Sequence, residues 1–408
     1  MNFVVFLGDG MADFPVPELG NRTPLQVADK PNMDRIAHQG RCGTLVTVED
    51  DMPPGSEVAN LTVLGYDPHQ VYQGRGVIEA ASMGVKLEDT DIGMRCNLIC
   101  IEDGLIKNHS AGHISTEEAA ELVEFLNQQL GTDNASFHPG ISYRHLLVLK
   151  QGSPEIECAP PHDHVGERAE DLLVRPRNDE AKPTAELLNS MIRKSWELLD
   201  QHPVNRKRRE QGKDPGNSMW VWSPGRKPKM TTFKESYGIT GAVISAVDLI
   251  KGIGIYAGLD VIEVEGATGL INTNYEGKAD ACLEALRDHD FVYLHVEAPD
   301  EAGHARDAKQ KVQSIEYLDS RLIARVMKGI EDRSIEARVA VLPDHATPVS
   351  KGNHIRGPVP VAIMGPGFEP DPVKVFDEES VLAGALGEWN RGAWVPMHGD
   401  RFLRTLLG

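Results

Sequence analysis

The sequence predicts an α/β fold with a doubly wound parallel sheet. Three short apolar runs are the main evidence, and each ends at an acidic residue: residues 3–7 before Asp9, 291–296 before Asp300, and 339–342 before Asp344. Near-continuous apolar runs of this length are typical of strands that are buried on both faces, as in parallel sheets. Helical segments alternate with these runs along the chain, and such alternation favours a doubly wound arrangement.

The helices between the strands are predicted from their periodicity and from their end signals. The first follows Pro31 and stops before Gly40, and the most strongly periodic one stops at Gly131. Proline at the start and glycine just past the end are typical helix boundaries. The expected helices cover residues 32–39, 117–130, 278–287 and 309–330.

The middle of the chain has a different pattern and predicts a second domain. It contains a strand-like run at residues 143–150, turns rich in proline and glycine, and a basic stretch at residues 206–209. We therefore expect residues 88–235 to form a smaller, inserted α+β domain. The core domain is then discontinuous and comprises residues 1–87 and 236–408.

Composition excludes several functional classes. The chain has 408 residues, 40% of them hydrophobic and 25% charged, which is typical of a soluble globular protein. No apolar window of about 18 residues occurs, so no membrane span is expected, and the N-terminus lacks the features of a signal peptide. The five cysteines are scattered, which predicts free thiols in a reducing cytoplasm. The net charge of −19 argues against nucleic acid as a partner, so any bound phosphate needs a local source of positive charge, such as metal ions.

Histidines accompany two of the three strand-end aspartates. His304 follows Asp300 by four residues, which places both on one helix face and suits two ligands of one metal ion, although a surface turn would also explain the pair. His345 is adjacent to Asp344 at a strand end, where the two side chains can splay towards two metals or simply form a turn. His354 precedes another predicted strand and is weaker evidence by itself.

Together these side chains predict a two-metal centre. Ligands of open α/β sheets bind beyond the carboxyl ends of the strands, so Asp9, Asp300 and Asp344 are expected to meet at one edge. Three aspartates and three histidines can hold two divalent ions about 4 Å apart. Such ions carry four positive charges against three carboxylates, and the excess favours an ionised serine and then a phosphoryl group.

Ser56 lies where a loop containing proline and glycine, within residues 52–60, breaks into a helix. A serine at a helix start can act as the N-cap. The same helix start offers free N–H groups and the positive end of the helix dipole to a phosphate. Both interpretations can hold together, and the chemical one makes Ser56 the residue that carries the phosphate.

Several runs resemble the archaeal-type, cofactor-independent phosphoglycerate mutases of the alkaline-phosphatase superfamily. The matching runs are LGDGMAD at 7–13, TPL at 23–25, PPGS at 53–56, ANL at 59–61, LGYDP at 64–68, APDEAGH at 298–304 and LPDH at 342–345. The resemblance extends nearly end to end, and the combined motifs are specific for the superfamily. It implies an alkaline-phosphatase-like sheet core with an inserted domain that closes over the substrate and excludes water.

The resemblance also implies the site and its cofactors. It implies two ligand sets: Asp300, His304 and His354 for one ion, and Asp9, Asp344 and His345 for the other, with the Ser56 oxygen beside it. Ser56 would attack a phosphoglycerate, form a phosphoserine and return the phosphoryl group to the other hydroxyl, without 2,3-bisphosphoglycerate. The ions would be Mn²⁺ or Zn²⁺, since mixed nitrogen and oxygen ligands do not choose between them.

The substrate pocket departs from the family pattern. The family's Asp-Arg-Arg-Ala-Gly-Arg-Ile run, whose arginines grip the substrate, is replaced by NHSAGHI at residues 108–114, and its Leu-Arg-Gly run by Val-Trp-Ser at residues 221–223. Neither histidine nor tryptophan reproduces the bidentate geometry of arginine. The remaining candidate substrate contacts are Arg144, His162 and Lys251, with His109 and His113 in place of the missing arginines.

These departures leave alternatives open. They match a subgroup that resembles a proposed alternative homoserine kinase, so a phosphotransferase with another acceptor is the second hypothesis. A plain phosphatase and a metal-binding regulatory protein without activity are the others. Phosphoserine formation at Ser56 would exclude the regulatory protein, and the acceptor would distinguish a mutase from a kinase.

Overall fold

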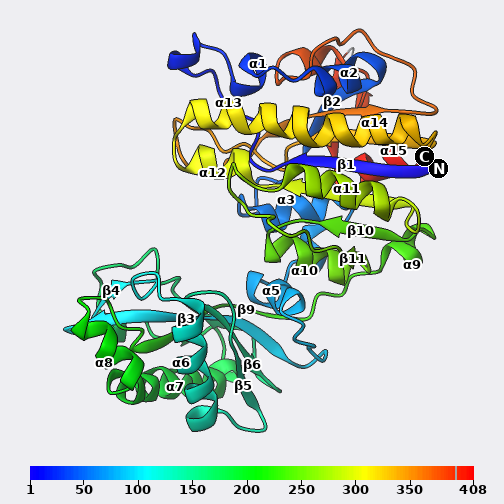
Figure 1. The fold of residues 1–408 in the computed structure, drawn as a ribbon. Helices are drawn as coiled ribbons and strands as arrows, with labels where there is room; N and C mark the ends of the chain where they lie inside the picture. The colour runs from blue at the N-terminus through cyan, green and yellow to red at the C-terminus, as the bar shows by residue number, and fades with distance from the viewer. Residues whose placement is uncertain (391–392) are drawn as a thin grey trace. The chain divides into compact units, whose positions relative to one another are not determined.

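The computed structural model describes residues 1–390 and 393–408, and these form two compact units (Figure 1). The larger unit comprises Met1–Tyr72 and Lys229–Gly408, and the smaller comprises Gln73–Pro228, which is inserted between them in the sequence. The boundaries expected from the sequence, after residue 87 and before residue 236, both lie later in the chain than the observed ones. The first differs because helix α5 (Arg75–Ser82) packs against strands of the smaller unit, a contact that the local sequence pattern does not reveal.

An eight-stranded sheet forms the centre of the larger unit, in the order β11-β10-β12-β1-β13-β14-β2-β17. The first five strands are parallel, β14 is antiparallel to both of its neighbours, and β17 is parallel to β2. The strands are β1 (Asn2–Gly8), β2 (Arg41–Val46), β10 (Gly241–Ile244), β11 (Asp260–Val261), β12 (Phe291–Val296), β13 (Ala337–Leu342), β14 (Pro358–Met364) and β17 (Met397–His398). The three strands predicted before aspartates are β1, β12 and β13, which lie side by side, so their carboxyl ends share one edge.

Helices surround this sheet in the α/β pattern that the sequence predicts. They are α1 (Pro24–Val27), α2 (Pro31–Gln39), α3 (Ser56–Val63), α4 (Pro68–Val71), α9 (Phe233–Tyr237), α10 (Asp248–Tyr256), α11 (Tyr275–Ala285), α12 (Ala298–His304), α13 (Ala308–Tyr317), α14 (Ala324–Asp332) and α15 (Arg401–Leu407). Short 3-10 turns lie at Pro17–Leu19 and Ser380–Ala383, and a small hairpin pairs β15 (Glu388–Asn390) with β16 (Ala393–Val395). No helix of the described residues is long and apolar enough to cross a bilayer.

The helix expected at residues 309–330 is α13 and α14 joined by a π-helical turn at Leu318–Ile323. Asp319 in this turn is buried, and its carboxylate accepts the backbone N–H groups of Asn32 and Met33. These are free donors in the first turn of α2, so Asp319 caps that helix from another element.

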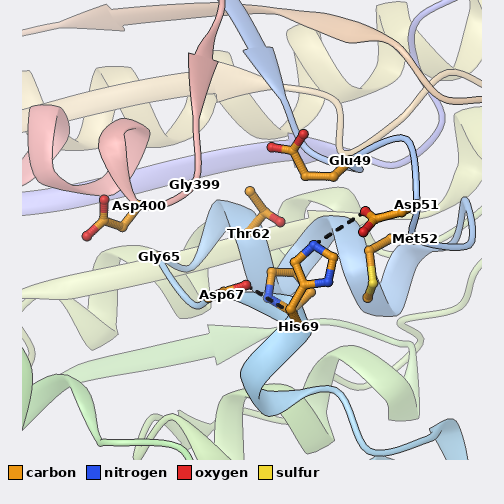
Figure 2. A pocket seen from close by; sticks show the side chains of 10 residues that line it. Glu49, Asp51, Met52, Thr62, Gly65, Asp67, His69, Gly399 and Asp400 are labelled. Atoms are coloured by element: carbon orange, nitrogen blue, oxygen red, sulfur yellow. Dashed lines mark hydrogen bonds and ion pairs between the residues drawn. The ribbon is translucent and has the colours of Figure 1, made fainter.

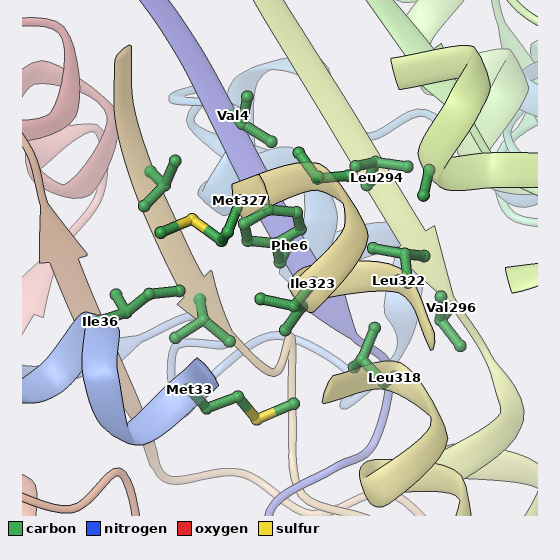
Figure 3. Close-up of a cluster of buried hydrophobic side chains, with 14 of the residues drawn as sticks. Val4, Phe6, Met33, Ile36, Leu294, Val296, Leu318, Leu322, Ile323 and Met327 are labelled. Carbon is green, nitrogen blue, oxygen red and sulfur yellow. The ribbon is translucent and has the colours of Figure 1, made fainter. Parts of the chain in front are cut away.

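One face of the central strands forms the main hydrophobic core (Figure 3). Val4 and Phe6 of β1 lie on this face, because alternate residues of a strand point to the same side. Leu294 and Val296 of β12 lie beside them, and all four are at most 1% exposed. They pack against side chains from α2, the π-helical turn and α14: Met33, Ile36, Leu318, Leu322, Ile323 and Met327.

The intervening residues of β12 point to the other face and include two polar side chains. Tyr293 and His295 are fully buried, yet each has a hydrogen-bond partner: Asn60 of α3 for the tyrosine, and Asp9 for the histidine. Buried polar groups are stable when they are paired in this way. This face therefore carries polar side chains towards the carboxyl edge of the sheet.

The smaller unit has its own antiparallel sheet and core. Its sheet runs in the order β4-β3-β6-β5, with β9 paired to β3. Its elements are α5, β3 (Ile92–Glu102), β4 (Leu105–Asn108), α6 (Thr116–Leu130), β5 (Ala135–His138), β6 (Arg144–Leu149), β7 (Ile156–Glu157), β8 (Arg175–Pro176), α7 (Lys182–Asp200), α8 (Pro203–Glu210) and β9 (Ser218–Arg226), with 3-10 turns at Ala169–Leu172 and Asp179–Ala181. This is the mixed α+β composition predicted for the insertion.

Candidate active site

The three strand-end aspartates converge at one edge of the sheet. Asp9, Asp300 and Asp344 are at most 4% exposed. The backbone N–H of Gly10 donates to Asp344 Oδ1 at 3.1 Å. Gly10 has a φ of +59°, and a Cβ atom there would lie 2.4 Å from Asp300 Oδ1, so only glycine fits the turn that brings the three loops together.

Two histidines join Asp300 to form an outer cluster. His304 Nε2 lies 3.1 Å from Asp300 Oδ2, and His354 Nε2 lies 3.5 Å from Asp300 Oδ1. The two Nε2 atoms are 2.9 Å apart, so both imidazoles point to the same place. His304 Nδ1 is 2.9 Å from the Gly352 carbonyl, which holds its ring by the other nitrogen. One carboxylate and two imidazoles thus converge as ligands of one cation would.

Asp9, Asp344 and His345 form an inner cluster beside Ser56. His345 Nε2 lies 3.6 Å from Asp9 Oδ1, 3.5 Å from Asp344 Oδ2 and 3.1 Å from Ser56 Oγ. Among the described residues, the side chains whose ligand atoms lie close enough together to hold a cation form two groups: Asp300, His304 and His354, and Asp9, Asp300 and His345. Asp300 therefore belongs to both groups, whereas the resemblance places it in only one and assigns Asp344 to the other.

The first helical residue of α3 is Ser56, and the N-cap position belongs to Gly55. No side chain caps this helix. The expectation that Ser56 is the N-cap is therefore wrong. Its hydroxyl points instead to His345, at the edge of the inner cluster.

The electrostatics of the two clusters are those of a cation site. Asp9 Oδ1 is buried and has no hydrogen-bond partner among the described residues. Burial, followed by the nearby carboxylates of Asp344 and Asp300, raises the pKa of Asp9 well above its ordinary value. Leaving such a carboxylate unpaired is costly, and a cation removes the cost. The carboxylate and imidazole groups of the two clusters are therefore suitable ligands for divalent ions.

The outer cluster titrates in the opposite direction. The hydrogen bond with Asp300 raises the pKa of His304 to about 9. Burial by itself would raise the pKa of Asp300, but its hydrogen bonds with His304 and His354 hold that pKa well below the usual range. Asp300 is thus ionised in the structure and already faces positive charge.

Two supporting residues were not predicted from the sequence. His295 Nε2 lies 3.0 Å from Asp9 Oδ2, and its Nδ1 lies 3.2 Å from Ser245 Oγ. Thr347 donates its hydroxyl proton to Asp300, and the same oxygen lies 3.3 Å from His345 Nδ1. The only available signal was a histidine within an otherwise apolar strand; the threonine follows Asp344-His345 by two residues without any motif.

Comparison with known proteins shows the family to which this chain is related. A family model described as 2,3-bisphosphoglycerate-independent phosphoglycerate mutase matches residues 37–205. A protein of that name from Methanosarcina acetivorans is 52% identical over 95% of this chain and 96% of its own length. The chain belongs to this family. A phosphoglycerate mutase 2 of the same type from Methanothermobacter thermautotrophicus is 47% identical over 95% of both chains.

Solved structures agree with the assignment to this mutase family. A Pyrococcus horikoshii protein matches with a TM-score of 0.83 at 30% identity, covering 100% of this chain and 96% of its own. The cofactor-independent phosphoglycerate mutase of Thermoplasma acidophilum matches with a TM-score of 0.70 at 26% identity, covering 100% and 98%. Both similarities span the two units, so the insertion is part of the fold of these relatives.

The candidate substrate contacts of this family member are divided between the units. Lys251 belongs to the larger unit, where its ammonium group pairs with Glu263 at 2.8 Å. The other four lie in the smaller unit. His109 packs against His162 and Tyr143, with ring centroids 6.3 and 5.9 Å apart, and His113 packs against Tyr143 at 6.4 Å. The Arg144 guanidinium lies 5.7 Å from the centre of the same tyrosine ring.

A cavity of about 510 Å³ in the larger unit is lined by other residues (Figure 2). Its walls carry four carboxylates: Glu49, Asp51, Asp67 and Asp400. His69 is the one basic side chain in this lining, with Nε2 3.4 Å from Asp51 Oδ1. An acidic wall repels phosphate, so this cavity does not compete with the aspartate–histidine clusters as the site of phosphoryl chemistry.

Proposed function

We propose that the protein interconverts 3-phosphoglycerate and 2-phosphoglycerate through a phosphoserine at Ser56, in glycolysis and gluconeogenesis and without 2,3-bisphosphoglycerate. The position of Ser56 Oγ, 3.1 Å from His345 Nε2 beside three buried carboxylates, is the observation that carries this proposal. The names of the relatives support the same reaction.

The protonation state of His345 follows from its neighbours. Burial lowers the pKa of His345, so the imidazole is neutral near pH 7. Thr347 donates its own proton to Asp300, and its oxygen is therefore free to accept the Nδ1 proton of His345. This tautomer leaves a lone pair on Nε2, directed at the Ser56 hydroxyl or at a cation.

The ligand sets are the two implied by the resemblance, with Asp300 added to the second because it also lies within reach of Asp9 and His345. Asp300, His304 and His354 would hold one ion, and Asp9, Asp344 and His345 the other, together with the Ser56 oxygen; Mn²⁺ is the first choice and Zn²⁺ the second. Divalent ions in such a centre lower the pKa of a bound hydroxyl and neutralise the charge of a phosphoryl group. The orphaned Asp9 Oδ1 supports this occupancy.

The phosphoryl transfer needs no other reagent. The Ser56 oxygen attacks phosphorus and loses its proton, while the bond from phosphorus to the glycerate oxygen breaks and that oxygen takes up a proton. The second half reverses these steps with the other glycerate hydroxyl as acceptor. The backbone N–H groups at the start of α3 favour the negative charge that develops at Ser56.

A substrate panel on purified, Mn²⁺-loaded protein tests the proposal. We expect ³¹P NMR to show conversion of 3-phosphoglycerate to 2-phosphoglycerate without added 2,3-bisphosphoglycerate. ATP-dependent phosphorylation of homoserine without mutase activity would replace the proposal by the kinase alternative. Release of inorganic phosphate alone would indicate a phosphatase.

Metal binding is expected to release protons and to weaken as the pH falls. His304 has a pKa of about 9 in the metal-free protein, so at pH 7.5 it carries a proton that a cation must displace. The apparent affinity of the outer cluster should therefore rise with pH until about pH 9 and then level off. Calorimetry at pH 7.5 in two buffers of different ionisation enthalpy should show about one proton released at this site.

The matched variant for this measurement is His304→Ala, which should lower the number of protons released by about one. Buffer-independent binding heats in the unmodified protein would contradict the assignment of His304 as a ligand.

The stability of the metal-free protein should depend on pH in the opposite sense to metal affinity. The His304–Asp300 pair stabilises the fold below pH 6.5, and that contribution disappears as the pH rises through about 9.

The inserted unit carries a cluster suited to an anion. Arg144 has no carboxylate partner among the described residues, and His109, His113 and His162 lie within the same group of rings. Burial lowers the pKa of His109, followed by the effects of His162 and His113, so His109 is a neutral hydrogen-bond donor near pH 7. We propose that this cluster binds the carboxylate or phosphate of the substrate in place of the family's arginines.

Arg144→Ala is expected to raise the KM for 3-phosphoglycerate about tenfold and to leave kcat within about twofold. One charge-assisted hydrogen bond contributes about 1.5–3 kcal/mol, and a uniform loss of ground-state and transition-state binding appears in KM. Steady-state kinetics measures both constants. Arg175→Ala, which removes an exposed arginine bonded to the Asp171 carbonyl, is the control; equal effects of the two variants would refute a substrate contact.

We also propose a cytoplasmic location. All five cysteines are free, and four of them are buried. Unpaired thiols are typical of proteins in a reducing compartment.

A further inference from the structure

We propose that Asn60, held by Tyr293, is a positioning residue that fixes the Ser56 nucleophile relative to the Asp344 carboxylate. The inference rests on the function proposed above and adds to it two residues that are neither the nucleophile nor metal ligands. It follows from three hydrogen bonds made by one buried amide.

Asn60 lies one helical turn after Ser56 on α3, so the two residues share a face of the helix. Its side chain is fully buried. The Nδ2 group donates one hydrogen bond to the Ser56 carbonyl at 2.8 Å and another to Asp344 Oδ2 at 2.9 Å. One side chain therefore bonds both the backbone of the nucleophile and a carboxylate of the inner cluster.

The third bond fixes which way the amide faces. Asn60 Oδ1 accepts the hydroxyl proton of Tyr293 at 2.5 Å. The Ser56 carbonyl and the Asp344 carboxylate can only accept, whereas a tyrosine hydroxyl can donate. The flipped amide would place its oxygen against two acceptors and its NH₂ group against a donor, so the chemistry of the three partners leaves one orientation.

Tyr293 keeps its hydroxyl proton at neutral pH and remains a donor there. It is fully buried on β12, and burial, followed by the charges of Asp344 and Asp9, raises the pKa of its hydroxyl well above the ordinary value. On the same face of β12, two residues later, His295 bonds Asp9. One strand thus supports two carboxylates of the inner cluster, Asp9 directly and Asp344 through Asn60.

The consequence for Asp344 is that its carboxylate cannot rotate. Its Oδ1 accepts the backbone N–H groups of Gly10 and His345 at 3.1 and 2.8 Å, and Oδ2 accepts from Asn60. Without Asn60, Oδ2 loses the Nδ2 donor at 2.9 Å, and α3 loses its direct link to the Asp344 carboxylate. Partners of this kind orient ligands, and losing one typically lowers metal affinity or activity about 10–100-fold.

The test uses Asn60→Ala, Tyr293→Phe and the double variant in the Mn²⁺-loaded full chain. We expect Asn60→Ala to slow single-turnover phosphorylation of Ser56 about a hundredfold with KM changed by less than about threefold, and Tyr293→Phe to slow it about tenfold. If Tyr293 acts through Asn60, the double variant should be no slower than Asn60→Ala. Multiplicative effects would overturn the link between the two residues.

The chain offers a structural control for each substitution. Asn205 is fully buried, and within the described part of the chain its amide bonds backbone groups of Leu199 and Gly216 alone. Tyr275 is fully buried, and its hydroxyl has no hydrogen-bond partner among the described residues. Asn205→Ala should lower Tm without slowing phosphorylation of the folded fraction, and Tyr275→Phe should change neither. A rate loss in Asn60→Ala no larger than in Asn205→Ala at equal folded fraction would overturn the proposal.

A second readout separates this inference from the proposed function. If the unmodified protein does not convert phosphoglycerate, the function fails, and Asn60 is then judged by Co²⁺ binding alone. Asn60→Ala and Tyr293→Phe should weaken Co²⁺ binding about tenfold or more and change its visible absorption spectrum, because Asp344 is no longer held. An unchanged affinity and spectrum in both variants would overturn the positioning role. If Asn60→Ala does not fold, Tyr293→Phe, which removes one oxygen atom, still decides between these outcomes.

Discussion

Ser56→Ala abolishes turnover: the expected loss in kcat is about 10⁴-fold or more, as for other enzymes that lose their nucleophile. Covalent labelling should disappear with it, because the Ser56 hydroxyl is the one that bonds His345 Nε2, at 3.1 Å, among the described residues. The measurement is single-turnover incubation with ³²P-labelled 3-phosphoglycerate, followed by mass spectrometry of the peptide that contains residue 56. Metal content should stay near that of the unmodified protein, since the aspartates and histidines remain.

The stability of the same variant distinguishes chemistry from helix capping. An N-cap serine would cost about 1 kcal/mol when it is replaced by alanine, but Gly55 occupies that position here. We therefore expect Tm to change little while turnover disappears. Ser320→Ala is the control, because among the described residues the Ser320 hydroxyl bonds the Glu316 carbonyl, one turn earlier in the chain. Full turnover in Ser56→Ala, or equal losses in the two variants, would contradict the covalent mechanism.

The meeting of the three aspartates at one edge of the sheet could be predicted because it depends on short segments of sequence. β1, β12 and β13 are continuous apolar runs, and the residues directly after them carry the chemistry, so burial and strand direction were sufficient to place Asp9, Asp300 and Asp344 together. The strand order across the sheet, and the antiparallel β14, depend on pairings between distant segments that no local pattern records.

The supporting residues could not be predicted for a related reason. Tyr293 and His295 lie within an apolar run, where the pattern indicates burial but not the partner. Their partners, Asn60 and Asp9, are more than 200 residues away in the sequence. A buried polar residue in a predicted strand is therefore a signal that a partner exists, and only the fold identifies it.

The division between the units shows the same limit. The sequence placed the first boundary after residue 87, where the composition changes, whereas the structure places it before α5. That helix is amphipathic and could cover either sheet. It packs on β3 and β9, and the Arg95–Glu79 ion pair joins it to β3 of the smaller unit.

Asp300→Ala is expected to remove metal from both clusters rather than from one. Asp300 is within reach of His304 and His354 on one side and belongs with Asp9 and His345 on the other. Metal content by elemental analysis should therefore fall below one ion per chain. The kcat should fall by more than about a hundredfold, because losing a residue that only supports a metal ligand can already lower activity by that factor. His304→Ala should leave the inner group intact and retain about one ion.

The matched control is Asp319→Asn, since Asp319 is also a fully buried carboxylate of the larger unit but bonds the first turn of α2. It should lower Tm and leave metal content unchanged, which separates loss of a ligand from loss of a buried charge. Retention of one ion per chain or more in Asp300→Ala would refute its role as a shared ligand.

The metal-free form of Asp300→Ala provides an independent check by NMR. The hydrogen bond that His304 donates to Asp300 is the largest cause of the raised pKa of His304, so without it that pKa should fall from about 9 towards 6.5. The direction is informative because the alternative explanation, a protonated His304 held by solvent and the Gly352 carbonyl, leaves the pKa high when the carboxylate is removed. A fall in the pKa together with loss of both ions would mean that one carboxylate sets the charge of the outer imidazoles and completes the inner group, which makes Asp300 the residue on which both halves of the site depend.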